Sequence, residues 1–298
     1  GLDRSISIRL RGSQKERLAQ TTFHEPWLFN HPLDGFASFF VEHTERPFFT
    51  ANRMDFSLQT LKRFSPIQNL LFTASYQTVN LQDIRQNPFA RKFPEERGII
   101  QIARVGSSFI RDRRNDPINP TSGTFYTTTF QVANRALGSE VDFTSLFNQS
   151  SFYSPAPKGV LATSVRLGWN QPYGPAEHLP ITERYFAGGS TSLRGFGLDR
   201  DGTGNALAIE TVEYRATLPI FPISGIGAAL FYDTGNAFDK ITTIHFSEFT
   251  HTAGFGLRYQ TPLGPVRLDF GFNLKPRTQP TGQMEQRLHV FFTLGNPF

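Results

Sequence analysis

The sequence predicts an all-β chain that folds as a transmembrane antiparallel β-barrel of about fourteen strands. Apolar and polar residues alternate along nearly the whole chain, whereas helical periodicity is almost absent. The alternating segments run about 9–14 residues, longer than the strands of soluble sandwiches and close to the length that crosses a bilayer. Charged residues occur in the middle of these segments, opposite the apolar face, which suits a water-filled lumen.

Each predicted strand is a run of two-residue alternation bounded by turn residues. In the first segment Ile6, Ile8 and Leu10 alternate with polar residues, and in the last Val290 and Phe292 do the same. In chain order the predicted strands are 5–12, 17–25, 35–45, 52–64, 69–81, 98–111, 123–136, 140–154, 159–171, 206–218, 225–238, 250–261, 264–275 and 286–295.

A soluble β-sandwich is the alternative, because it would bury the same apolar faces against each other. Aromatic residues near the predicted strand ends favour the barrel, since they resemble the belts at membrane interfaces; examples are Phe48-Phe49, Phe152-Tyr153 and Phe231-Tyr232. The mean hydropathy is -0.32 and no apolar run approaches ~18 residues, so transmembrane helices are excluded.

Composition narrows the function classes. The chain has 298 residues and no Cys, which excludes a disulfide scaffold and Cys-ligated metals. The formal net charge is +5, but the basic residues are scattered, which indicates a solvated polar surface and no nucleic-acid partner. No signal peptide is recognisable, so we expect a mature protein or an excised domain, with residues 1–298 forming a single barrel.

Patterns of catalysis or cofactor binding are missing from the sequence. The segment Gly188-Gly189-Ser190 does not fit a Gly-x-Ser-x-Gly nucleophile motif, and the seven His residues lack metal-ligand spacing. Residues 199–205 resemble the start of a calcium loop without its downstream Glu, a pattern also typical of plain turns. We therefore expect no enzymatic activity, no cofactor and no metal.

The longest predicted connection, 172–205, carries the most specific motif. It contains Arg184-Tyr185-Phe186-Ala187-Gly188-Gly189-Ser190 followed by Leu193-Arg194-Gly195-Phe196. This closely resembles the signature of extracellular loop six in the BamA/TamA family of outer-membrane assembly factors, also called the bacterial surface-antigen family. Further ordered matches to that family are Arg111-Asp112-Arg113-Arg114-Asn115-Asp116 with Pro120-Thr121-Ser122-Gly123, then Phe231-Tyr232-Asp233-Thr234-Gly235-Asn236, Thr261-Pro262-Leu263-Gly264-Pro265 and the terminal Phe298.

The predicted loop site is made of signature residues and two lumenal acids. Gly189 and Gly195 flank Arg194, so the backbone can turn sharply and project its guanidinium. If the loop folds into the lumen, Arg194 needs carboxylate partners, and the resemblance implies Glu213 and Asp233 on the next two strands. We expect Arg194, and not Arg200, to reach them; an ordinary solvent-facing arginine is the alternative. The signature residues are Gly188, Gly189, Leu193, Arg194, Gly195 and Phe196.

The last strand is the second predicted site. It resembles the family's C-terminal β-signal, carried here by Val290, Phe292, Leu294, Gly295 and Phe298. In the family, the first and last strands form a weak seam that opens and templates incoming strands. Gly295 and Pro297 pair poorly in a ladder, so we expect the junction of 5–12 with 286–298 to be the least stable in the barrel.

The strand count departs from the family, whose barrels have sixteen. The motifs align residues 5–12 with the family's third strand, so truncation is the favoured interpretation and the periplasmic POTRA repeats are missing from this sequence. A natural fourteen-stranded relative is the alternative, because an even number of antiparallel strands still closes.

The resemblance implies an integral protein of the bacterial outer membrane. Its expected function is insertion, assembly or translocation of outer-membrane proteins through the lateral seam. A protein-secretion pore of the two-partner or self-secretion type is the alternative. The implied partners are the lipid bilayer, unfolded or nascent outer-membrane or secreted proteins, and periplasmic accessory proteins that POTRA repeats would bind.

Overall fold

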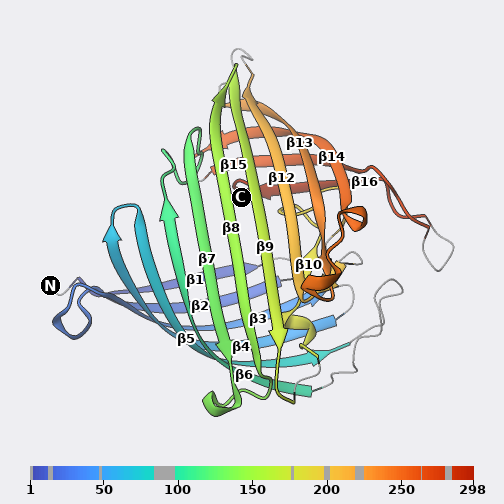
Figure 1. Cartoon of the computed structure of the whole chain (residues 1–298). Coiled ribbons are helices and arrows are strands. Elements are labelled where there is room, and N and C mark those ends of the chain that lie inside the picture. Colours follow the sequence, from blue (N-terminus) through green and yellow to red (C-terminus); the bar gives the residue numbers. More distant parts are fainter. Residues whose placement is uncertain are drawn as a thin grey trace.

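The computed structural model describes residues 3–298 except 13–15, 47–48, 84–97, 176–177, 198–201, 219–224, 263 and 279–283. Its main feature is one 14-stranded antiparallel sheet in which each strand pairs with its neighbours in chain order (Figure 1). The predictions of an all-β chain and of fourteen strands are confirmed. No helix in the described part of the chain is both long enough and apolar enough to cross a membrane.

The strands follow the alternation that predicted them. Their bounds are β1 Ser5–Gly12, β2 Glu16–Glu25, β3 Asp34–Arg46, β4 Phe49–Ser65, β5 Gln68–Gln82, β6 Gly98–Asp112, β7 Gly123–Ala133, β8 Phe143–Ala156, β9 Gly159–Pro172, β12 Ala206–Thr217, β13 Ile226–Phe238, β14 Thr250–Thr261, β15 Gly264–Asn273 and β16 Leu288–Leu294. The connection from β9 to β12 adds a small second sheet of β10 Tyr185–Ala187 and β11 Gly202–Gly204. Five 3-10 turns complete the described elements: η1 Leu28–Asn30, η2 Arg135–Leu137, η3 Ile181–Glu183, η4 Ile241–Thr243 and η5 Phe246–Glu248.

The two faces of the sheet differ in chemistry. Large apolar side chains project outward and stay exposed, for example Ile6 at 71% and Phe292 at 76%. Polar and charged side chains are buried on the inner face, for example Ser151, Glu213 and Asp269. A soluble protein rarely exposes so continuous an apolar surface, so a lipid-facing exterior explains the pattern.

Part of the aromatic-belt interpretation was wrong. Phe49, Tyr153 and Phe231 are buried on the inner face. Their sequence neighbours Phe152 and Tyr232 are exposed on the outer face. The reason is the two-residue period of a strand, which sends adjacent side chains to opposite faces. Only one member of each such pair can therefore lie at the membrane interface.

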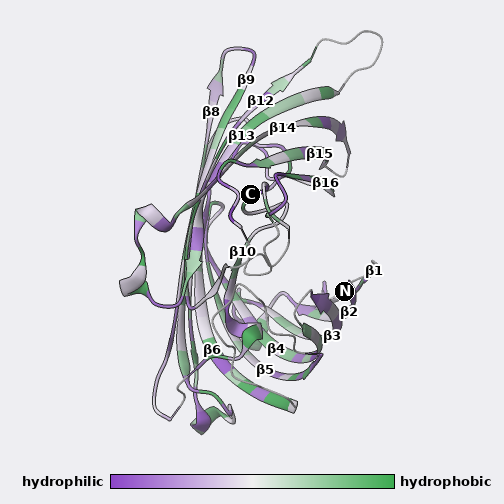
Figure 2. Ribbon diagram, turned by 90° about the vertical axis from the view of Figure 1, so that its right-hand side faces the viewer, coloured by the Kyte–Doolittle hydropathy of each residue, from purple (hydrophilic) through white to green (hydrophobic). Residues whose placement is uncertain are grey.

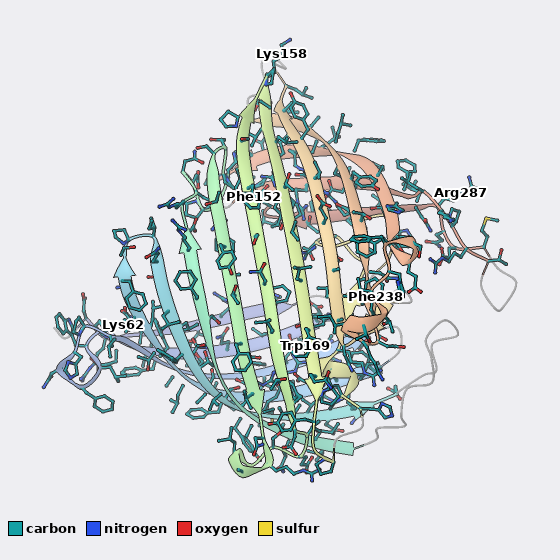
Figure 3. The ribbon with its side chains drawn as sticks, in the orientation of Figure 1. Lys62, Phe152, Lys158, Trp169, Phe238 and Arg287 are labelled. Carbon is teal, nitrogen blue, oxygen red and sulfur yellow. The ribbon has the colours of Figure 1, made fainter. Side chains whose placement is uncertain are left out.

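The connections between strands lie at the two ends of the sheet. Strands alternate in direction, so successive connections lie at opposite ends of the sheet. Lys158 marks the tip of the tight β8–β9 turn at one end (Figure 3). The long connections 134–142, 173–205, 239–249 and 274–287 all lie at the other end. The longest connections of the barrel therefore lie at one end, although the end with the β8–β9 turn also carries the ten-residue connection 113–122.

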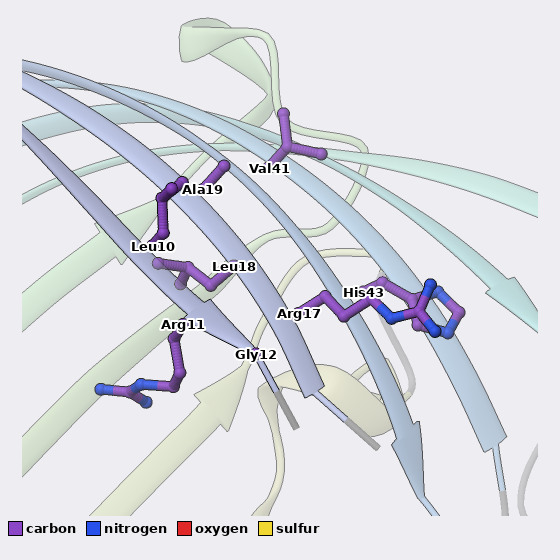
Figure 4. Close-up of a pocket in the computed structure, with 8 residues that line it drawn as sticks. All are labelled: Leu10, Arg11, Gly12, Arg17, Leu18, Ala19, Val41 and His43. Atoms are coloured by element: carbon purple, nitrogen blue, oxygen red, sulfur yellow. The ribbon is translucent and has the colours of Figure 1, made fainter. Parts of the chain in front are cut away.

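The sheet is open along one side. Within the described residues, β1 pairs with β2 alone and β16 pairs with β15 alone. Figure 2 shows the two edge strands facing each other across a gap. A shallow pocket lies beside this gap, at the end of β1 on the outer surface of β1–β3 (Figure 4). We call the gap between β1 and β16 the seam.

Placing a charge on the outer face tests its contact with lipid. Leu257 lies near the middle of β14 and is 50% exposed on the outer face. We expect Leu257→Arg to destabilise the folded barrel by about 2–4 kcal/mol in lipid, because the guanidinium would lie near the bilayer midplane. Urea unfolding in liposomes measures the change. Tyr259→Arg, two residues nearer the strand end, should cost less; equal costs would contradict the lipid-facing assignment.

Candidate functional site

The β9–β12 loop folds back against the inner face of the sheet. Gly188 has a φ of +149°, and a Cβ at this position would lie 2.4 Å from the carbonyl oxygen of Gly197, so only glycine fits. The Gly189 N–H donates to the Phe196 carbonyl at 3.1 Å. The Ser192 N–H donates to the Gly189 carbonyl, also at 3.1 Å. These bonds close residues 189–196 into a compact tip that presents Arg194.

Arg194 is held by two acids from neighbouring strands. Its Nε and Nη2 donate to the two carboxylate oxygens of Asp233 on β13 at 3.0 and 2.8 Å. Its backbone N–H donates to the same carboxylate at 3.0 Å, and Nη1 donates to Glu213 on β12. The guanidinium carbon lies 3.4 Å from the ring centroid of Phe231. The Arg194 side chain is 1% exposed and both acids are fully buried.

Charge pairing explains why Arg194 tolerates this burial. Burial alone would lower the pKa of its guanidinium. The charges of Asp233 and Glu213, and the hydrogen bonds to them, outweigh that effect and raise the pKa of Arg194 above its usual value. The arginine therefore stays protonated, and its fork-shaped donors fix the loop in direction as well as in position.

Glu213 links Arg194 to further arginines on the wall. Arg215 Nε donates to Glu213 Oε1 at 2.7 Å, and Arg258 Nη2 donates to Glu213 Oε2 at 3.3 Å. Arg258 also pairs with Asp269, which accepts from Arg267 at 3.2 Å. Together with Arg194 and Asp233, these residues form a network of four guanidinium and three carboxylate groups across β12–β15.

Apolar contacts place the tip beside the ion network. Leu193 and Phe196 pack with Leu207 and Ile209 of β12 in a buried cluster. Gly195 lies against β14 and β15, where a Cβ would come within 2.7 Å of the Phe272 carbonyl oxygen. The loop tip thus sits directly on the backbone of the wall, which leaves no room for a side chain at position 195.

The end of the chain departs from the sequence prediction. Val290, Phe292 and Leu294 face outward on β16, next to the seam. Phe298, predicted to belong to the seam, instead lies on the inner face, where its main-chain oxygen accepts from the Tyr153 hydroxyl at 3.0 Å. Gly295 has a φ of +91° and makes the last ladder-like bond, to the Pro265 carbonyl at 2.8 Å. β16 ends at Leu294, and Pro297, which has no N–H, cannot extend its ladder; the chain turns inward after the strand (Figure 2).

The structure brings most of the predicted loop-site residues together. Gly188, Gly189 and the 193–196 tip share one turn against Glu213 and Asp233. Arg200 lies outside the described residues, as do the other two residues of 199–201, the first part of the 199–205 segment that resembled a calcium loop. In the described ranges, no group of three or more His, Cys, Asp or Glu side chains has an arrangement that would hold a metal ion.

Some residues of the network were not predicted as a site. Arg258, Arg267 and Asp269 are among the charges in the middle of the predicted strands, but their link to Glu213 depends on the register of four strands. Arg215 is also a charge on the inward face of its strand, because it lies two residues after Glu213. Strand alternation gives the face of a residue, whereas the contact between distant strands comes only from the three-dimensional fold.

Comparison with known proteins identifies the family. The model of the Omp85 superfamily domain matches residues 1–298, the whole chain. The chain belongs to the Omp85 superfamily. The outer membrane protein assembly factor BamA of Nitratidesulfovibrio vulgaris is 27% identical to this Omp85 barrel over 214 residues, which is 66% of this chain and 26% of that protein. The chain thus spans about a quarter of that relative's length.

Solved structures share the fold. BamA from Haemophilus ducreyi lacking POTRA domains 1–3 superposes with a TM-score of 0.79 at 16% identity, covering 98% of this chain and 64% of that one. CdiB from Acinetobacter baumannii matches with a TM-score of 0.56 at 14% identity, covering 93% and 49%. CdiB from Escherichia coli matches with a TM-score of 0.59 at 16% identity, covering 93% and 52%.

Family membership fixes the class of this protein. It is an Omp85 outer-membrane β-barrel that resembles BamA. The BamA relative is an assembly factor, and the expectation of no catalytic activity agrees with the family. The lumenal site around Arg194 holds a loop in place.

Proposed function

We propose that this Omp85 barrel inserts unfolded outer-membrane proteins into the bacterial outer membrane through the seam between β1 and β16. The end with the longest connections would face outward and the end with the β8–β9 turn would face the periplasm. POTRA repeats, if they precede this barrel, would recruit client proteins and accessory factors.

The open seam is the observation that carries this proposal. β1 and β16 each have one paired edge, and their other edges face each other without a ladder in the described residues. An unpaired strand edge presents N–H and C=O groups that readily add another strand. In lipid these groups are costly to leave unpaired, so an incoming β-strand would satisfy them. Pairing at the seam would convert an unfolded client into a barrel one strand at a time.

The β1 edge is suited to a transient partner. All eight residues of β1 are exposed, and Ile6, Ile8 and Leu10 supply a short apolar outer face. Among the strands that the structure describes, β2 alone pairs with this strand, joining Ser5–Gly12 to residues 17–24. A short edge strand with so few contacts can exchange its partner more easily than a strand in the centre of the sheet.

Secretion of a protein through the lumen is the alternative function. The polar and charged inner face favours it, because such a lining would hydrate an unfolded chain. The loop tip argues against a permanently open pore, since Arg194 and Phe196 occupy part of the lumen with almost no exposure. Under the secretion model this tip must leave the lumen, whereas under the assembly model it stays in place while the seam opens.

Reconstitution distinguishes the two functions. We expect liposomes containing the full chain to accelerate the folding of a urea-unfolded, eight-stranded outer-membrane barrel, measured by its heat-modifiable gel mobility. Liposomes with a closed-sheet porin of similar size provide the control for bilayer defects. Equal acceleration by both proteins would contradict the assembly function. Large, persistent ion conductance without acceleration would favour the pore.

A further inference from the structure

We propose that Arg104 and Glu183 form a second lock on the β9–β12 loop, independent of Arg194, so that the loop ties the two halves of the open sheet together. The inference deepens the proposed assembly function and rests on it, because it assigns the loop a role in limiting how far the seam opens. Arg104 and Glu183 are positioning residues in this scheme.

The second lock is a bidentate ion pair. Arg104 lies on the inner face of β6, and its Nη1 and Nη2 donate to the two carboxylate oxygens of Glu183 at 2.9 and 3.0 Å. Nη2 also donates to Gln77 of β5 at 2.8 Å. The side chains of Arg104 and Glu183 are only 13% and 9% exposed. A paired and buried geometry of this kind is directional and little screened by salt.

Apolar packing surrounds this pair and involves only the first half of the loop. Ile181 is buried with Phe49 and Ala51 of β4 and with Val79 and Leu81 of β5. Leu179, also buried, packs with Ile102 of β6, Ala133 of β7 and Phe143 of β8. Residues 179–183 are therefore attached to the wall formed by β4–β8.

The second half of the loop is attached elsewhere. Arg194 binds β12 and β13, and Gly195 lies on β14 and β15. Gly197 reaches β16, where a Cβ at this glycine would lie 3.6 Å from His289 Nε2. One continuous loop thus contacts the sheet from β4 to the edge strand β16, and each half has its own buried arginine–carboxylate pair.

This arrangement has a mechanical consequence. The sheet is open at the seam, so widening the seam changes its curvature and moves the β4–β6 wall relative to the β12–β16 wall. A loop bonded to both walls resists that motion. Breaking the Arg194 pair alone leaves the loop on β6, and breaking the Glu183 pair alone leaves it on β12 and β13. The two locks together therefore set the range of seam opening.

Site-resolved proteolysis tests the second lock. Phe186 packs against the cluster that contains Ile181. In the full chain folded in detergent, we therefore expect Glu183→Gln to accelerate chymotrypsin cleavage after Phe186 by about tenfold and to leave cleavage after Phe196 unchanged. Asp233→Asn should give the opposite pattern. Glu42→Gln is the matched control, because it breaks the lumenal Arg53–Glu42 pair without contacting the loop.

Reversing the charges separates a specific pair from a general loss of packing. The double variant Arg104→Glu with Glu183→Arg should restore slow cleavage after Phe186, whereas Arg104→Glu alone should not. Arg104→Gln serves as a second single variant if Glu183→Gln fails to show heat-modifiable folding. Unchanged cleavage in both single variants, or absence of rescue by the reversed pair, would overturn the second lock.

Seam opening provides the mechanical readout. With both locks broken, in Glu183→Gln with Asp233→Asn, ion conductance in planar bilayers should exceed that of either single variant. Equal conductance in all three would overturn the tie across the sheet. None of these measurements uses a client protein, so failure of the second lock and failure of the assembly function give different results.

Discussion

Replacing Arg194 by Ala is expected to release the loop tip and to destabilise the folded barrel by about 3–5 kcal/mol, less where water enters the lumen. The largest loss falls on Asp233, which would lose both guanidinium donors and keep the Thr252 hydroxyl at 3.3 Å and the backbone N–H of residue 194. The free-energy cost at Glu213 would be smaller because Arg215 and Arg258 remain bonded to its carboxylate. Urea unfolding in lipid and chymotrypsin cleavage after Phe196 measure the two effects.

A double variant tests the physical cause of that loss. Arg194→Ala with Asp233→Asn removes the buried charge that the single substitution leaves unpaired. We therefore expect the double variant to be more stable than the sum of the two single losses predicts. Strict additivity, or an Arg194→Ala variant with unchanged cleavage after Phe196, would show that the pair does not hold the loop.

The seam should crosslink far more slowly than any other junction of the barrel. The chain has no Cys, so introduced pairs report without interference. Leu257 and Leu268 are register partners on β14 and β15, and Cys at both positions should close quickly because paired strands bring Cα atoms within disulfide range. Ile8→Cys with Val290→Cys, across the seam, should close at least about tenfold more slowly.

Scanning several positions makes this comparison decisive. The same test applies with Ile6 or Leu10 on β1 and Leu288 or Phe292 on β16, all exposed on the outer face. We expect slow and uneven closure at every such pair. Rapid, uniform disulfide formation along the junction would show a sealed barrel of fourteen strands and would contradict the open seam.

The fold could be predicted because the sequence pattern that indicates each strand lies within that strand. Each strand carries its own two-residue alternation, and one face must meet lipid while the other meets the lumen. Ile8 and Leu257 could therefore be assigned to the outer face from their neighbours alone. The register follows from the same pattern, because a shift by one residue would turn charges such as Arg267 and Asp269 toward lipid.

The loop arginine was predictable for a different reason. Its signature combines glycines that permit a tight turn with a charge that must be paired. Both features can be recognised within residues 188–196 of the sequence. The acids Glu213 and Asp233 lie on the next two strands, so the chain distance to them is short. Resemblance to the family then selected these acids from the other inward charges.

The remaining contacts join residues far apart in the chain. Glu183 precedes the signature directly, yet nothing local indicates that it meets Arg104 across the lumen. Phe298 bonds to Tyr153 although 145 residues separate them. Such contacts depend on how strongly the whole sheet curves, and strand periodicity carries no information about curvature.

Stapling the seam tests the proposed function most directly. A bismaleimide linker between Cys at positions 8 and 290 would tie β1 to β16, and a staple between positions 257 and 268 on paired strands is the control. If clients fold through the seam, the first staple should abolish client assembly in liposomes and the control staple should leave it intact. Full assembly activity with a stapled seam would contradict the account.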